Sequence, residues 1–410
     1  MDDTPSTTSR RRFLGMAGAA GATLAAGSVV ACSSDDDSSD EATATDSVRY
    51  PFRSAHQAGV TAPAGAAGIV AGLDVRVDGR EELREVFARL SDSIEQVMGG
   101  EPFEERPGGF PPIDTGILGP NPGATGTTVT VGVGDSLFDD RFGLASRKPT
   151  ELQRMFKFGN DFLVRDERSH GDLSVTVSAD TNDAAVHAFR QVLRATRGKV
   201  VPKWMRPGFN DILPDAGPGE APVRNLMGFK DGTSNPDGAD PETMDDLVWV
   251  QPDDDQPDWA VGGSYQVIRV IRMQVEFWDR TRLSEQEAIF GRHRDTGAPL
   301  GAELETDTPE FTDLESHIAR ANPRTPGSER NLILRRGFNY ADGLDGNDQL
   351  DQGLIFVSYQ RSLEAGFITV QRRLDGEALE EYIRPVGGGF FFALPGPGSE
   401  SGPLGAALLA

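Results

Sequence analysis

Histidine, arginine and aspartate side chains are the candidates for chemistry in this chain of 410 residues, because its single cysteine is Cys32. One cysteine cannot form an internal disulfide. It also excludes CxxC zinc sites, cysteine-ligated iron–sulfur clusters and CxxCH cofactor attachment. Any metal must therefore be held by His, Asp or Glu, or within a cofactor that is bound without a covalent link.

The chain has five histidines: His56, His170, His187, His293 and His317. We interpret His187, in a helix among charged and small residues, and His293, in the sequence GRHRDTG, as ordinary structural or solvated side chains. His317 lies near the apolar stripe of a short predicted helix that Asn322-Pro323 ends. It is either a core histidine with satisfied hydrogen bonds, the more common case, or a ligand presented into a cavity.

Two consecutive arginines, Arg335 and Arg336, follow the apolar residues NLIL in a predicted strand. Because side chains alternate along a strand, the two guanidinium groups point to opposite faces, and at least one points where an apolar core is expected. An unpaired buried arginine is costly. The inward arginine is therefore either half of a structural ion pair or a fixed cation that faces an anionic ligand.

The segment GFKDGTSNPDG, residues 228–238, places Asp231 beside a glycine. Asp-Gly and Asn-Pro are turn dipeptides, so this segment alone is typical of an ordinary loop. The aspartate, the histidine and the inward arginine indicate a site only in combination.

Residues 1–31 have the pattern of a twin-arginine export signal: SRRRFLG at 9–15 precedes an Ala/Gly-rich run that is too short for a comfortable membrane span. This route exports folded proteins, often with their cofactor, so we expect the protein in the periplasm or on the extracellular face. The sequence VVAC at 29–32 resembles a lipobox, which makes Cys32 a candidate for lipid attachment. The alternative is cleavage nearby without a lipid. Residues 32–47 are predicted to form a disordered acidic tether.

The charge balance is acidic, with 64 Asp and Glu against 40 Lys and Arg and a formal net charge of −24. A field of this sign repels nucleic acids and anionic membranes, so we expect no nucleic-acid partner.

Hydrophobic periodicity in the first half predicts strands at 68–77, 127–134, 172–180 and 199–205 and helices at 80–98 and 182–197. The order β-α-β-β-α-β is that of a ferredoxin-like unit. The second half repeats this order less cleanly, with strands predicted at 264–278, 331–340 and 353–360 and a closing strand in GGGFFFAL. Short helices are predicted at 284–291, 312–321, 363–374 and 377–383.

We therefore expect an α+β fold of two ferredoxin-like domains with antiparallel sheets. The N-terminal domain is predicted at 48–215 and the C-terminal domain at 216–410.

Seven ordered blocks resemble the dye-decolourising haem peroxidases, in particular their twin-arginine-exported branch that is associated with iron uptake. These blocks are QAGV at 57–60, GDSLFDDRFGL at 134–144, GDLSVTVSAD at 171–180, GFKDGTSNP at 228–236, HIARANPR at 317–324, ILRRGFNY at 333–340, and DQGLIFVSYQRSLEAGFITVQRRL followed by GGGFFFALPG. They span most of the predicted mature chain. The two ferredoxin-like domains of that family agree with the order of elements above. The resemblance implies a fold of the dimeric α/β-barrel type, in which the C-terminal domain at 216–410 binds the haem.

The resemblance implies a role for each candidate residue. The family's acid/base aspartate falls on Asp231, its peroxide-stabilising arginine on Arg335, and its iron-ligating histidine on His317. One branch of the family carries an asparagine two residues after the arginine, whereas this chain has Gly337. Other residues that would contact one non-covalent haem b are Gly232, Thr233, Ser234, Asn322, Pro323 and Arg324.

The resemblance implies a peroxidase that uses hydrogen peroxide to oxidise dyes and other aromatic one-electron donors. A second hypothesis is a haem-binding component of iron acquisition that releases iron from haem or supports a ferrous-iron importer through iron-transport partners. A third is a barrel of this type without a cofactor. We further expect a homo-oligomer.

Overall fold

The computed structural model describes residues 48–104, 107–213, 216, 220–310, 314–399 and 402–410. The predicted signal peptide and acidic tether, with Cys32, lie outside the described residues. In the part of the chain that the structure describes, no helix is long and apolar enough to cross a membrane.

The first half forms a four-stranded antiparallel sheet with two helices on one face. Its elements are β1 (Ala67–Val75), α1 (Arg80–Gly99), β2 (Thr128–Gly134), β3 (Leu173–Ala179), α2 (Asn182–Ala195) and β4 (Val200–Phe209). The strand order is β2-β3-β1-β4, which is the order of a ferredoxin-like unit. The predicted stripe of α1 is fully buried from Leu83 to Ile94, and the side chain of Thr181 caps α2 by accepting a hydrogen bond from the amide of Ala184.

The second half repeats this strand order. The strands β7 (Ser264–Met273), β9 (Phe338–Leu344), β10 (Leu350–Gln360) and β11 (Ile383–Ala393) lie in the order β11-β7-β10-β9. Pairing of β4 with β9 and of β11 with β2 joins the two sheets, and the pairing of β7 with β10 completes a barrel. The expected architecture of two ferredoxin-like repeats is confirmed.

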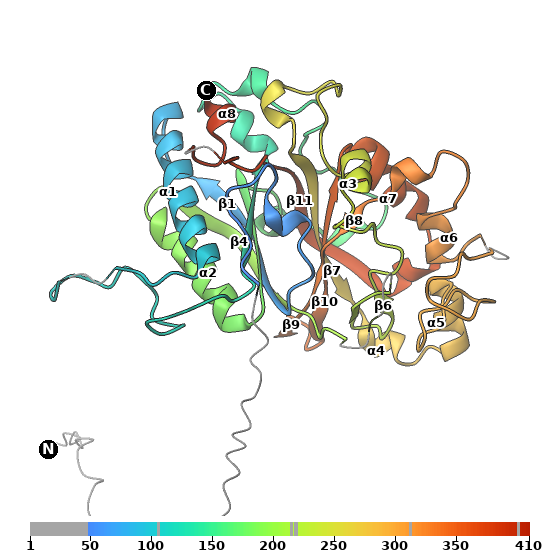
Figure 1. The fold of residues 1–410 in the computed structure, drawn as a ribbon. Coiled ribbons are helices and arrows are strands. Elements are labelled where there is room, and N and C mark those ends of the chain that lie inside the picture. Colours follow the sequence, from blue (N-terminus) through green and yellow to red (C-terminus); the bar gives the residue numbers. More distant parts are fainter. Residues whose placement is uncertain (1–47, 105–106, 214–215, 217–219, 311–313, 400–401) are drawn as a thin grey trace, which may run out of the picture. The chain divides into compact units, whose positions relative to one another are not determined.

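Short helices surround the second half. They are α3 (Pro241–Leu247), α4 (Val275–Trp278), α5 (Leu283–Phe290), α6 (His317–Ala321) and α7 (Thr369–Leu374), with α8 (Ala406–Leu409) near the C-terminus. A π-helical turn at Glu364–Ile368 leads directly into α7. In Figure 1, α5, α6 and α7 lie on the side of the strands away from α1 and α2. Two short strand pieces, β5 (Val223–Arg224) and β6 (Lys230–Asp231), pair with each other.

Neighbouring strands of the second half separate a barrel interior from a second, outer face. Val270 and Ile355 pair across β7 and β10 and belong to the apolar cluster inside the barrel. Their neighbours Ile271 and Leu354, also a cross-strand pair, point to the other face, because side chains alternate along a strand. This outer face supplies one wall of the site described below.

Three predicted boundaries in the second half are wrong. The strand predicted at 264–278 ends at Met273, because the chain turns into α4 and the carbonyl of Gln274 accepts the hydrogen bonds of that turn, from the amides of Phe277 and Trp278. The strand predicted at 331–340 is divided into β8 (Leu334–Arg335) and β9. Of the segment predicted to be helical at 377–383, only 378–381 forms a turn of 3₁₀-helix, after which β11 begins.

The helix predicted at 312–321 is also shorter than expected. Among the described residues of this segment, 314–321, the helix α6 begins only at His317. Ser316 has an extended backbone, and its carbonyl accepts the first hydrogen bonds of the helix, from Ala319 and Arg320. Leu314 is therefore outside the helix and 67% exposed.

Candidate functional site

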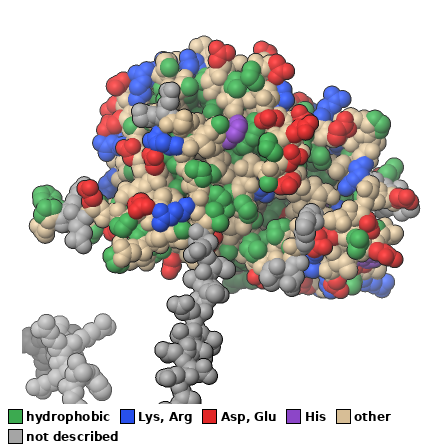
Figure 2. Space-filling view, viewed as in Figure 1, with side chains coloured by type: hydrophobic (Ala, Val, Ile, Leu, Met, Phe, Trp, Pro, Cys, Tyr) green, Lys and Arg blue, Asp and Glu red, His purple; other side chains and the backbone are tan. Residues whose placement is uncertain are grey.

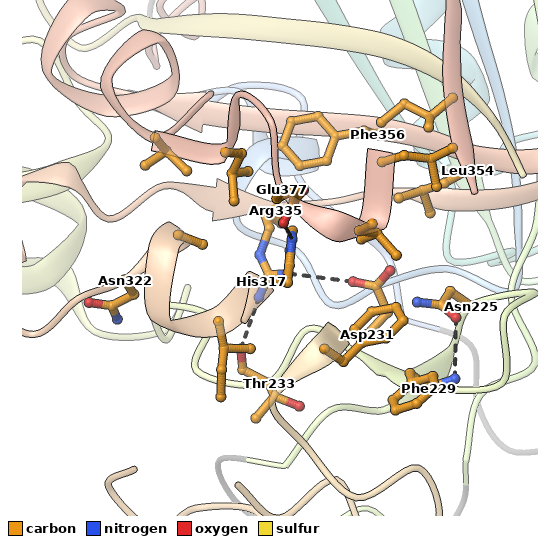
Figure 3. A pocket seen from close by; sticks show the side chains of 18 of the residues that line it. Asn225, Phe229, Asp231, Thr233, His317, Asn322, Arg335, Leu354, Phe356 and Glu377 are labelled. Atoms are coloured by element: carbon orange, nitrogen blue, oxygen red, sulfur yellow. Dashed lines mark hydrogen bonds and ion pairs between the residues drawn. The ribbon is translucent and has the colours of Figure 1, made fainter. Parts of the chain in front are cut away.

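A cavity of about 270 Å³ lies between the outer face of the second sheet and the short helices. Its sheet wall includes Ile271, Leu354, Phe356 and Ile383. Its helical side includes His317 of α6, together with apolar side chains around the π-helical turn and α7: Phe367, Val370 and Leu374. The walls are mostly apolar, and a few polar groups converge on the space between them (Figure 3).

His317 is the only histidine among the described residues that line this cavity. Its Nδ1 lies 2.8 Å from Oε2 of Glu377, whose side chain is only 3% exposed. Burial acts to lower the pKa of His317, but the charge of Glu377 and its hydrogen bond outweigh burial, so the pKa is raised. Since Nδ1 is committed to Glu377, Nε2 is the ring nitrogen available to a ligand, and the carboxylate increases its basicity.

Asp231 and Arg335 form the second polar group in the cavity. Asp231 ends β6, and Arg335 lies on β8, which pairs with β10. Arg335 Nη1 lies 3.5 Å from Asp231 Oδ1, and Nη2 donates to the carbonyl of Thr233 at 2.9 Å. The side chain of Asn235 accepts from the amide of Arg335 at 2.8 Å and donates to its carbonyl at 3.1 Å. These two hydrogen bonds hold the loop after Asp231 against the strand that carries Arg335.

Gly337 leaves no room for the asparagine that one branch of the resembled family carries at this position. A Cβ atom built on Gly337 would lie 2.9 Å from the carbonyl oxygen of Ile355 and 3.5 Å from a methyl group of Leu354. Without that asparagine, Asp231 and Arg335 are the polar side chains that we expect to act on a ligand on this side of the cavity.

One edge of the cavity is rich in cations. Arg292 and Arg324 both line it, and their guanidinium groups lie 3.5 and 3.4 Å from the hydroxyl of Ser234. Burial lowers the pKa of Arg292, and the positive charges of Arg324 and Arg335 lower it further, against the opposing effect of Glu305. Burial also lowers the pKa of Arg324. Such an edge favours an anionic ligand, because an added carboxylate would offset the mutual repulsion.

The structure brings most of the predicted site residues to this one cavity. The lining includes Asp231, Gly232, Thr233, Ser234, His317, Asn322, Arg324 and Arg335. Pro323 is not among the described lining residues. It follows Asn322, the C-cap of α6, where a proline prevents the helix from continuing.

Sequence reasoning missed Glu377, Leu354, Phe356 and Arg292. Glu377 is a single glutamate before a short helix, and Leu354 and Phe356 are apolar residues within a strand. Such residues have no local sequence signal that distinguishes a site. His187 and His293, which we interpreted as structural or solvated, lie elsewhere: His187 is buried against the hydroxyl of Thr115, and the side chain of His293 is 44% exposed.

Comparison with known proteins assigns the family. The N-terminal model of the Dyp-type peroxidases matches residues 57–210, and the C-terminal model matches residues 222–397. Deferrochelatases of Escherichia coli O157:H7 and Shigella sonnei are 45% identical over 371 residues, which cover 88% of this chain and 87% of theirs.

Solved structures agree. A DyP-type peroxidase from Cellulomonas bogoriensis is 33% identical, with a TM-score of 0.78 over 89% of this chain and 99% of that one. Ferric DtpA from Streptomyces lividans is 34% identical, with a TM-score of 0.78 over 89% of this chain and 98% of that one. The chain therefore belongs to the Dyp-type peroxidase family and is a haem-dependent peroxidase that uses hydrogen peroxide and electron donors.

Proposed function

We propose that this cavity holds haem b and that the protein uses it to oxidise aromatic one-electron donors, dyes included, with hydrogen peroxide. The observation that carries the proposal is the convergence of three elements on one apolar cavity. His317 comes from α6, whereas Asp231 and Arg335 come from β6 and from β8 beside the sheet wall.

The residues present fit this cofactor. The single cavity histidine has one ring nitrogen bound to Glu377 and the other available for iron. The walls formed by Ile271, Leu354 and Phe356 suit an apolar macrocycle, and the edge formed by Arg292 and Arg324 suits its propionates. When bound, haem would supply an iron that can react with peroxide and the capacity to store oxidising equivalents.

Asp231 and Arg335 would handle the proton and the charge of the peroxide. The carboxylate of Asp231 accepts a proton from one oxygen of hydrogen peroxide and returns it to the oxygen that leaves as water. Positioned acid–base groups of this kind contribute about 10² to 10⁴ in rate. The guanidinium of Arg335, held by Thr233 and Asn235, stabilises the negative charge that appears on the peroxide oxygens during the transfer. Over the complete cycle each hydrogen peroxide takes two electrons from donors and two protons, and gives two waters, of which the first is the one formed with the help of Asp231.

The charge of the protein surface favours some electron donors over others. Acidic side chains are spread over the face seen in Figure 2, in keeping with the formal net charge of −24. Such a surface attracts cationic donors and repels anionic ones, with an effect that salt weakens.

A second candidate function is the release of iron from haem. The observation that favours it is the match at 45% identity to proteins named deferrochelatases. Iron-transport proteins would then be partners of this chain.

One experiment on haem-loaded protein compares the two functions. We expect oxidation of a cationic dye that requires hydrogen peroxide and is lost when either peroxide or haem is left out. A parallel sample without peroxide is assayed for metal-free porphyrin. Porphyrin release with no dye oxidation would overturn the peroxidase role and leave the iron-release function.

We also propose, from residues 1–47, that the chain is exported in the folded state by the twin-arginine route. Replacement of Arg10 and Arg11 by lysine, which keeps the charge, is expected to retain the protein in the cytoplasm. Lipid attachment at Cys32 is tested in the same fractionation by Cys32→Ala, which should move the mature protein from the membrane to the soluble fraction. Unchanged export of the lysine variant would contradict the route.

A further inference from the structure

Glu305 lies directly behind the loop that carries Asp231, and no part of the function above requires it. Its side chain is 1% exposed. Oε1 accepts hydrogen bonds from the hydroxyl of Thr233 at 2.7 Å and from the amide of Ala221 at 2.8 Å. Oε2 forms an ion pair with the ammonium of Lys230. One buried carboxylate therefore contacts residues on both sides of Asp231.

The loop that Glu305 contacts has an unfavourable backbone. Gly232 has φ +108°, and Ser234, which is not a glycine, has φ +58°. A non-glycine residue in the left-handed region persists only where the surroundings fix it. Four side chains do so here. Glu305 acts through Thr233, Asn235 acts through the backbone of Arg335, and Arg292 and Arg324 act through the hydroxyl of Ser234.

The segment opposite the loop makes room for the ion pair. Gly297 has φ +75°, and a Cβ atom built on it would lie 2.8 Å from Cδ of Lys230 and 3.2 Å from Cδ of Glu305. The guanidinium of Arg292 donates to the carbonyls of Gly297 and Glu305 at 2.7 and 3.3 Å, and so holds this segment against the cation-rich edge of the cavity. Glu305 is thus itself held in place through its backbone carbonyl, by an arginine that also contacts the loop at Ser234.

A series of polar contacts connects Glu305 to the reacting groups, Arg335 and Asp231. Glu305 accepts from the hydroxyl of Thr233, and the carbonyl of the same Thr233 accepts from Arg335, whose Nη1 faces Asp231. A shift of the Thr233 backbone would change the position of Asp231 relative to Arg335. Loss of the Glu305 charge would also leave the ammonium of Lys230, whose side chain is 12% exposed, with Glu220 at 3.4 Å as its one charged partner among the described residues.

We propose that Glu305 is a positioning residue for the acid/base loop: it holds Lys230 and Thr233 so that Asp231 stays aligned with Arg335 and with the peroxide between them. The proposal rests on the roles of Asp231 and Arg335 given above. A carboxylate that only stabilised the fold would affect haem content and thermal stability, but it would not act specifically through Asp231.

Glu305→Gln tests this in haem-loaded protein, because glutamine keeps the size of the side chain and loses its charge. The matched control is Glu303→Gln, an exposed glutamate on the same segment. Both are made in the natural chain and in Asp231→Asn. We expect Glu305→Gln to lower kcat/KM for hydrogen peroxide by about 10- to 100-fold, a typical cost of misplacing a catalytic group by about 1 Å. The KM for the dye should be unchanged, and Glu303→Gln should match the natural chain.

The Asp231→Asn background separates positioning from stability. With no carboxylate left to position, Glu305→Gln should lower kcat/KM by less than about threefold there, because residues that act as a unit are not additive. Independently of activity, hydrogen–deuterium exchange of residues 228–236 in haem-free protein should be faster in Glu305→Gln and unchanged in Glu303→Gln.

Two results would overturn the inference: an unchanged kcat/KM in Glu305→Gln, or an equal loss in both backgrounds with unchanged exchange at 228–236. If Glu305→Gln does not fold, Thr233→Val removes only the hydroxyl that Glu305 holds, and it must show the same coupling to Asp231. Full activity of Asp231→Asn on its own would instead reject the proposed role of Asp231, whatever the result at Glu305.

Discussion

Asp231→Asn is expected to lower kcat/KM for hydrogen peroxide by about 10² to 10⁴, the contribution of a positioned acid–base group. The amide has the size of the carboxylate but cannot take up the peroxide proton. Haem content, read from the visible spectrum, should be unchanged, since Asp231 is not the residue proposed to ligate iron. The measurement is the steady-state rate against peroxide concentration with the dye at saturation.

The control for this variant is Asp237→Asn, an exposed carboxylate on the same loop. It should retain the activity of the natural chain, because its side chain accepts a hydrogen bond from the amide of Ala239 and is not among the described residues that line the cavity. A loss of less than about threefold in Asp231→Asn would mean that another group carries the proton. Glu380 would be the next candidate, since it lines the cavity and its pKa is raised by burial and by the charges of Asp375 and Glu377.

His317→Gly is expected to abolish stable haem binding, and peroxidase activity with it. The iron would lose its only histidine ligand among the described residues that line the cavity, while Glu377 would be left buried without its ring partner. Glycine leaves a space of the size of the lost ring. Added imidazole should therefore restore the haem spectrum and part of the activity.

The matched control is His293→Gly, because the side chain of His293 is 44% exposed and lies outside the cavity. It should bind haem as the natural chain does. Retention of full haem content by His317→Gly without imidazole would show that a different residue ligates the iron.

Local sequence pattern was a good guide where one face of an element is buried along its length. The stripe Leu83, Val86, Phe87, Leu90 and Ile94 predicted α1, and all of these side chains are fully buried. The same reasoning failed at α6 because that helix is a single short turn fixed by Ser316 and by tertiary contacts, with too few residues to show a period. After Met273 the alternating pattern continues through Val275 and Phe277, but the chain turns into α4, whose first hydrogen bonds go to the carbonyl of Gln274.

The assembly of the site could not be derived from spacing. Asp231, His317 and Arg335 are brought together by the pairing of β8 with β10 and by packing of α6 against α7, contacts between segments far apart in the chain. Resemblance to known peroxidases located these residues. Glu377 and Glu305 carry no periodic or motif signal, since each acts through a single buried carboxylate whose partners become neighbours only in the fold.

The central claim is that Asp231 and Arg335 act together on one peroxide molecule in the cavity that contains His317. A double-mutant cycle tests this claim most directly. The rate at which the haem spectrum changes after peroxide is added is measured by stopped flow in the natural chain, Asp231→Asn, Arg335→Leu and the double variant. We predict that each single variant is slower by about 10² or more, and that the double variant is scarcely slower than the slower single variant. Independent, multiplicative losses, or a rate in either single variant equal to that of the natural chain, would contradict the claim.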